Sequence, residues 1–132
     1  AAIGNRGELV QPTLLKGGEQ KNRPVSIEID DQWYQIVHEG MRQAATEGTA
    51  RGLNVPYVNV AAKTGTAELG VSKANVNSWV MGFWPYEKPR YAFVVLMNEG
   101  SRYNLTGATF VMRQLFDWMR DSKPDYLKGV SE

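Results

Sequence analysis

Apolar and polar positions repeat with helical spacing in two parts of the chain. The first stretch begins at Asp30, which can cap a helix, and ends within the polar residues 47–52. Its expected apolar face consists of Trp33, Ile36, Val37, Met41, Ala44 and Ala45. The second follows residues 98–104 and consists of Ala108, Val111, Met112, Leu115, Trp118 and Met119. We therefore expect two amphipathic helices with Trp33 and Trp118 as core anchors, and a frayed polar tail from Lys123.

Between these stretches the pattern changes to a period of two, which is typical of strands. Val58, Val60 and Ala62 alternate with Asn59, Ala61 and Lys63. Residues 76–84 and 91–97 predict two further strands that pair as a hairpin, and the second of these is apolar on both faces, so we expect it to be central. Residues 8–16, interrupted by Pro12, predict an edge strand. The order strand, helix, three strands, helix predicts an α+β fold: an antiparallel sheet with helices packed on it.

The amino-acid composition argues against several classes of function. Apolar residues make up 42% and charged residues 22% of the 132 residues, which is typical of one globular domain or part of one. The net charge of +1 gives no basis for binding nucleic acid. The chain has no cysteine, and we expect its single histidine, His38, to be a surface residue, so neither a cofactor nor a metal site is predicted. No apolar run has the length of a membrane span.

One short motif suggests chemistry: Lys63-Thr64-Gly65-Thr66-Ala67, at the end of a predicted strand. The lysine can present an ammonium to a groove, the glycine leaves room for a ligand backbone, and the threonine hydroxyls can bind a carboxylate. An exposed strand edge could add an extended peptide by main-chain pairing. The alternative is that Lys63 is a solvated edge residue that discourages aggregation. The tripeptide alone favours that alternative.

The ordered set of motifs around this strand resembles the transpeptidase domain of class B penicillin-binding proteins, most like those named penicillin-binding protein 2. The matching residues are Trp33, Gly40-Met41, Gly48-Thr49-Ala50, Lys63 to Ala67, Ser78-Trp79, and Gly82-Phe83 with Pro85. The opening residues 1–16 are similar to a segment of that domain as well. The resemblance covers nearly all of the chain, and it identifies residues 1–132 as the C-terminal portion of such a domain.

The resemblance implies a role for each residue of the motif. Lys63 would join the hydrogen-bond network of the site and help hold the serine of the second motif and the carboxylate of the ligand. Thr64, Gly65 and Thr66 would bind the substrate, with the threonines holding the carboxylate of a D-Ala-D-Ala stem peptide or of a β-lactam. The backbone N–H of Thr66 would form half of the oxyanion hole, so Lys63 and Thr66 are the candidate catalytic residues.

The other two motifs of the family, S-x-x-K and S-x-N, are absent from the chain. Serines occur at positions 26, 72, 78, 101, 122 and 131, and none has a lysine three residues on or an asparagine two residues on. Tyr57-Val58-Asn59 imitates a Y-x-N motif but lies just before Lys63, so we interpret it as part of the strand. We expect the nucleophile in an upstream part of the same protein, and the isolated chain to be inactive.

Three hypotheses remain at this point. The first is a portion of a membrane-anchored D,D-transpeptidase that acts outside the cytoplasmic membrane. Its partners would be the stem peptide, β-lactam antibiotics and the missing N-terminal part, or a second copy paired through an exposed sheet. The second is a non-catalytic peptide-binding module. The third is part of a serine β-lactamase or penicillin sensor, which the tryptophan-bearing hairpin disfavours.

Overall fold

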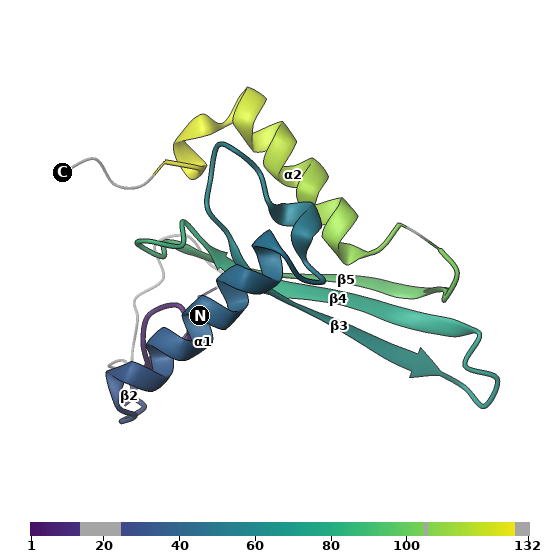
Figure 1. Ribbon diagram of the computed structural model, residues 1–132, viewed down its shortest axis with the longest axis horizontal. Helices are drawn as coiled ribbons and strands as arrows, with labels where there is room; N and C mark the ends of the chain where they lie inside the picture. Colours follow the sequence, from purple (N-terminus) through teal and green to yellow (C-terminus); the bar gives the residue numbers. More distant parts are fainter. Residues whose placement is uncertain (14–24, 105, 129–132) are drawn as a thin grey trace.

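The structure is a computed structural model that describes residues 1–13, 25–104 and 106–128. Its centre is a three-stranded antiparallel sheet of β3 (Ala61–Leu69), β4 (Asn75–Trp84) and β5 (Tyr91–Ser101), in the order β3-β4-β5. Helices α1 (Asp31–Thr46) and α2 (Ala108–Ser122) lie on opposite sides of this sheet (Figure 1). The predicted α+β class and the predicted hairpin are both confirmed.

The remaining elements are short. Strands β1 (Glu8–Leu9) and β2 (Val25–Ser26) form a separate antiparallel pair, and the rest of the predicted first strand is irregular up to Thr13 or lies outside the described residues. The 3-10 helices η1 (Arg51–Leu53) and η2 (Pro124–Tyr126) follow α1 and α2. Neither α1, with 16 residues, nor α2, with 15, is long and apolar enough to cross a membrane, and the described residues contain no helix that is.

The main core lies between the sheet and α2. Because residues paired across strands share a face, Ala62, Val80 and Val95 point to the α2 side. Met112, Phe116 and Met119 of α2 cover them, and the turn and loop before β3 close the cluster. Leu127 is also buried here, and Trp84 Nε1 donates to the Tyr126 carbonyl over 2.9 Å. Residues 123–128 therefore pack on the domain, and the predicted fraying of the tail is wrong for them.

The N-terminus of α2 receives its cap from the sheet. Gly107 has no side chain to cap the helix, and the Ala108 N–H donates to Ser78 Oγ of β4 over 3.0 Å. A Cβ atom at position 107 would lie 2.8 Å from the same oxygen. Glycine at 107 therefore lets the helix end approach the strand closely enough to be capped by it.

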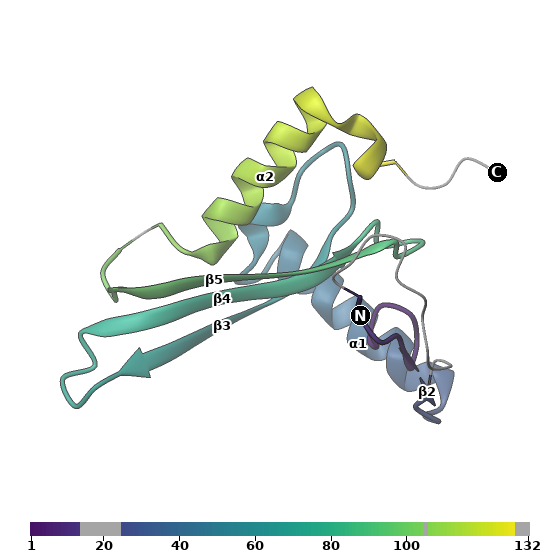
Figure 2. The same ribbon diagram turned by 180° about the vertical axis from the view of Figure 1, so that it is seen from behind.

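Helix α1 packs near the start of β3, at one end of the opposite face of the sheet (Figures 1 and 2). Asp30 caps it as predicted, accepting from the Gln32 N–H over 3.1 Å. Its buried side chains are Tyr34, His38 and Ala45. Trp33 is 57% exposed, and Ile36 and Val37 are exposed as well, so the predicted core role of Trp33 is wrong.

His38 was predicted at the surface and is instead 4% exposed. Its Nε2 lies 2.6 Å from the Ile3 carbonyl oxygen, and its ring contacts Phe83 of β4 at a centroid distance of 4.7 Å. Residues 34, 38 and 45 fall on one face of α1 at helical spacing, and this is the face that is buried. His38 thus joins the N-terminal segment, α1 and β4.

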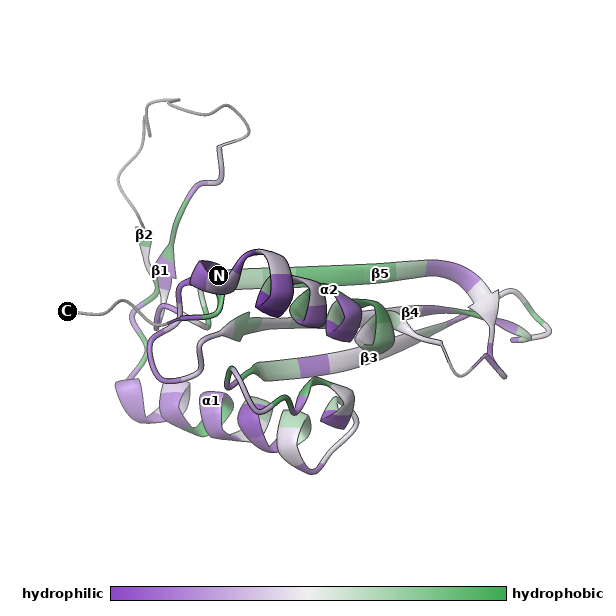
Figure 3. Ribbon diagram, turned by 90° about the horizontal axis from the view of Figure 1, so that it is seen from above, coloured by the Kyte–Doolittle hydropathy of each residue, from purple (hydrophilic) through white to green (hydrophobic). Residues whose placement is uncertain are grey.

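Two other predictions are corrected by the described sheet. Strand β5 is an outer strand rather than the central one, and β4 lies in the middle. Figure 3 shows the apolar character of β5 along much of its length at this outer position. Trp118 is 53% exposed, while Phe116 occupies the core position of α2.

Candidate functional site

The Lys63–Ala67 motif lies on β3, whose neighbour in the described sheet is β4 alone, so its other edge is open there. Lys63 pairs with Met81, and Met81 pairs with Val94 of β5. These three side chains therefore share the face opposite α2. Helix α1 covers only one end of that face, and Figure 1 shows the sheet extending well past it. Lys63 is accordingly exposed.

Thr64 and Thr66 point to the other face, because side chains alternate along a strand. Thr64 pairs with Val80 and is half-buried, whereas Thr66 pairs with Ser78 and is exposed. The structure therefore does not gather Lys63 and the two hydroxyls on one surface. It places them on either side of an outer strand, where a ligand lying along the strand edge could contact both.

Two short hydrogen bonds organise the start of the motif. Lys63 Nζ donates to the Thr64 carbonyl over 2.7 Å. Thr64 Oγ1 lies 2.6 Å from Thr49 Oγ1, in the turn between α1 and η1. No ion pair of Lys63 occurs within the described residues. Thr49 belongs to one of the matching motifs, but no contact with Thr64 was predicted for it. Their separation of fifteen residues carries no periodic signal that could have revealed it.

Gly65 is exposed, and a side chain at this position would meet little. An added Cβ would have Trp79 Cβ as its nearest neighbour, at 3.5 Å, which is an ordinary contact. Packing among the described residues therefore does not require a glycine here.

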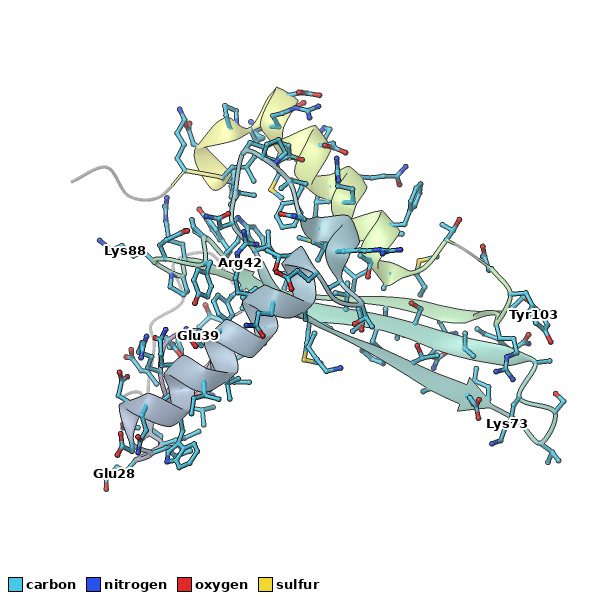
Figure 4. All side chains as sticks on the ribbon, viewed as in Figure 1. Glu28, Glu39, Arg42, Lys73, Lys88 and Tyr103 are labelled. Atoms are coloured by element: carbon cyan, nitrogen blue, oxygen red, sulfur yellow. The ribbon has the colours of Figure 1, made fainter. Side chains whose placement is uncertain are left out.

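A depression of about 170 Å³ lies beside Thr66, and sequence reasoning did not identify it. Its lining includes Ser78, Asn98, Arg102 and Asn104, from β4, β5 and the connection to α2. Beyond it, Glu68 pairs with Lys73 at 3.0 Å and with Arg102 at 3.8 Å. Lys73 and Tyr103 mark this end of the sheet, away from α1, in Figure 4. These pairs are exposed, so their contribution to stability is small.

The imitation Y-x-N motif lies in the loop before β3 and not in the strand as predicted, and its side chains have partners elsewhere in the structure. The Tyr57 hydroxyl donates to Asp117 of α2 over 2.7 Å. Asn59 accepts from Arg42 of α1 over 2.7 Å and donates to Glu87. Burial, and then the bond to Asp117, raise the pKa of Tyr57 to about 12, so its hydroxyl stays protonated. Neither side chain is directed at Lys63 in these contacts.

Residues 1–117 match the penicillin binding protein transpeptidase domain family. The chain belongs to this family. Curated relatives named peptidoglycan D,D-transpeptidase PbpA, from Mycobacterium tuberculosis and Mycolicibacterium smegmatis, are 30% identical in an alignment of 123 residues that covers 81% of this chain. The chain spans about a quarter of the length of these relatives, 24% in each case.

Solved structures of the family share the fold. Pseudomonas aeruginosa PBP2 superposes with a TM-score of 0.72 at 23% identity, over 93% of this chain and 29% of that one. Penicillin-binding protein A from M. tuberculosis, in an imipenem acyl-enzyme complex, gives 0.66 at 26% identity, over 88% and 28%. The predicted family and fold are therefore confirmed. The roles of Lys63, Thr64, Gly65 and Thr66 are not tested by these similarities.

Proposed function

We propose that residues 1–132 are the C-terminal portion of a transpeptidase domain whose complete protein cross-links peptidoglycan stem peptides. The observation that carries the proposal is the Lys63–Thr66 strand with an open edge in a chain of this family. The serine of the complete protein attacks the D-Ala-D-Ala amide carbonyl, and the terminal D-alanine leaves with the serine proton on its amine. A stem-peptide amine then takes the acyl group and returns a proton to the serine. A β-lactam acylates the same serine, as the imipenem complex of the M. tuberculosis relative illustrates for that protein.

In this proposal the edge of β3 binds the substrate. The Thr64 carbonyl accepts from Lys63, and the N–H and C=O groups of alternate residues in a strand point to the same edge. This supports a Thr66 N–H that faces away from β4, where it can serve as an oxyanion-hole donor. The open space around Gly65 supports close approach of a ligand backbone. Thr64 and Thr66 supply hydroxyl donors for the carboxylate, and Lys63 supplies positive charge beside the serine.

The chain lacks the acylating serine, so its partners include the upstream part of the same protein. The proposed protein is anchored in the bacterial cytoplasmic membrane, with this domain on the outer side where stem peptides occur. The isolated chain would hold the substrate-binding strand and be inactive alone.

Labelling with a fluorescent penicillin tests the proposal. We expect the complete protein, as its gene encodes it, to form a covalent adduct and the isolated chain to form none. Lys63→Ala in the complete protein is expected to slow labelling by about 100-fold or more, by analogy with the loss of one preorganised electrostatic group. Lys73→Ala is the matched control, because Lys73 pairs with Glu68 at the far end of the sheet.

Labelling of the isolated chain would contradict the absence of a nucleophile, and a complete protein that is never labelled would contradict the proposal itself. The second candidate, a non-catalytic peptide-binding module, is favoured by the open edge of β3 alone. It predicts peptide binding without an adduct. Rapid hydrolysis of the penicillin would instead identify a β-lactamase.

A further inference from the structure

Thr49 is linked to the proposed substrate-binding strand by one hydrogen bond. Its Oγ1 lies 2.6 Å from Thr64 Oγ1, so the turn after α1 and the strand β3 meet through two hydroxyl groups. Thr64 is the proposed carboxylate ligand, and any role of Thr49 through this bond rests on that proposed function. Thr49 itself has no role in the function proposed above.

The backbone fixes the position of Thr49. The Gly48 N–H donates to the Gln43 carbonyl over 3.1 Å, and the Ala50 N–H donates to the Ala44 carbonyl over 2.9 Å. Ala50 is fully buried in the main core. A Cβ atom at Gly48 would lie 2.9 Å from Ala44 Cα, so the turn packs directly on the end of α1. Thr49 therefore sits between two anchored neighbours, and its hydroxyl reaches Thr64 from a rigid support.

A count of protons decides the direction of the bond when a ligand is present. Each threonine hydroxyl has one proton to donate and two lone pairs to accept with. A carboxylate can only accept, so Thr64 must give it its single proton. The bond between the two threonines must then carry the proton of Thr49. A hydroxyl that accepts one hydrogen bond is also polarised toward donating another.

We propose that Thr49 is a positioning residue for carboxylate recognition. It donates to Thr64 Oγ1 and leaves the Thr64 proton directed at the carboxylate of the stem peptide or β-lactam. Thr49 does not touch the ligand. Its effect should therefore be larger for a ligand with a free carboxylate, a charged acceptor, than for one with a neutral ester.

The test uses the complete protein with Thr49→Val, which keeps the branched shape and removes the hydroxyl, and Thr49→Ser, which keeps the hydroxyl. The matched control is Thr46→Val, because within the described residues the Thr46 hydroxyl bonds only to the Arg42 and Gln43 carbonyls of its own helix, each at 3.3 Å. The measurement is the second-order rate constant of acylation by a penicillin and by the methyl ester of the same penicillin. Thermal midpoints are recorded alongside.

For the free-carboxylate penicillin, we expect Thr49→Val to lower the rate constant roughly three- to tenfold, the effect of one hydrogen bond. Thr49→Ser should restore it to within about twofold, and Thr46→Val should match the unsubstituted protein. For the methyl ester, Thr49→Val should lower the rate constant less, because the ester carbonyl is a neutral and weaker acceptor. An unchanged rate with the free carboxylate, or an equal loss with both compounds, would overturn the role of Thr49. If the unsubstituted protein is not acylated at all, the proposed function fails and this inference fails with it.

Discussion

At the scale of single residues, Tyr57 and Asp117 form the central contact between the loop before β3 and helix α2. The Asp117 carboxylate accepts from Tyr57 over 2.7 Å, from Arg113 over 3.1 Å and from Arg120 over 3.2 Å. The bond from Tyr57 is the largest cause that lowers the pKa of Asp117, followed among the lowering effects by Arg113. The ionised carboxylate and the protonated phenol thus stabilise each other in the folded state.

Tyr57→Phe should flatten the pH dependence of stability at both extremes. The lowered pKa of Asp117 gives stability that is present above its ordinary value of 3.8 and is lost as the pH falls through the lowered value. The raised pKa of Tyr57 gives stability that is present below pH 10 and is lost as the pH rises toward about 12. Urea midpoints across the pH range measure both losses, with Tyr103→Phe as control because Tyr103 is 83% exposed. Equal acid and alkaline losses in Tyr57→Phe and the unsubstituted chain would contradict this coupling.

His38 illustrates what residue patterns could not predict. A single histidine on the polar side of the predicted helix was expected to face water. His38 is instead buried, where it contacts the Ile3 carbonyl and the Phe83 ring. The helix has apolar residues on two faces, and the sequence does not say which face meets the sheet. Thr49 is a second example, because its partner is distant in the chain and both side chains are ordinary polar groups.

At the scale of elements, each helix uses one apolar face and leaves other large apolar side chains exposed. In α2 the buried residues are Ala108, Met112, Phe116 and Met119, whereas Phe110, Leu115 and Trp118 are exposed. Helix positions and strand pairing could be predicted because their periods are strong. The choice of buried face depends on the element opposite. Likewise, the apolar character of β5 suggested a central strand, a position it lacks among the described strands.

Phe116→Ala should destabilise the chain far more than Trp118→Ala. The Phe116 ring is fully buried and lies 5.2 Å from the Trp84 ring and 6.2 Å from the Phe93 ring, centroid to centroid. Its removal leaves a cavity that costs about 3–5 kcal/mol. Trp118→Ala removes an exposed side chain and should cost about 1 kcal/mol or less. Equilibrium denaturation of the two variants measures the difference, and similar losses would place Trp118 in the core after all.

Gly82→Ala and Gly40→Ala should change stability in opposite directions. A Cβ at Gly82 would meet the Ala61 carbonyl oxygen and lie 2.8 Å from Phe93 Cε1, so β3 or β5 must shift, at a cost of about 1–3 kcal/mol. A Cβ at Gly40 meets nothing within 4 Å on an exposed part of α1. Alanine there should stabilise the helix by about 0.5–1 kcal/mol. Thermal denaturation distinguishes the two variants. A Gly82→Ala variant as stable as the unsubstituted chain would show that β3 or β5 can shift without a loss of stability.

At the scale of the whole molecule, the face of the sheet opposite α2 is largely uncovered. Val94 is 62% exposed, and Met81 and Leu96 are exposed beside it. An apolar pocket of about 450 Å³ lies between this face, Met41 of α1 and residues 1–4. Contiguous apolar surface of this kind is typical of an interface. The uncovered face is consistent with the finding that the chain spans 24% of the length of its curated relatives.

We expect the isolated chain to associate with itself through this face and through the outer edge of β5. Sedimentation velocity should show association that increases with concentration, because water-exposed apolar surface is removed. The double substitution Val94→Lys with Leu96→Lys should give a monomer. Val71→Lys is the matched control, since Val71 is fully exposed in the turn between β3 and β4. A chain that stays monomeric without substitution would contradict the expectation.

The family could be predicted from the sequence because its motifs occur in a fixed order, and the similarity to transpeptidase domains confirms it. The face on which Lys63 lies followed from strand alternation. The depression beside Thr66 could not be predicted, because its lining comes from β3, β4, β5 and the connection to α2, which only the folded sheet brings together.

The cap that Ser78 provides for α2 has a consequence for the order of folding. A helix that carries its own capping residue can begin to form before it docks, but the first turn of α2 is capped by an oxygen thirty residues earlier, on β4. Helix nucleation is unfavourable, and the cap becomes available only once the strand is in place. Capping of the first turn of α2 therefore depends on the formation of β4.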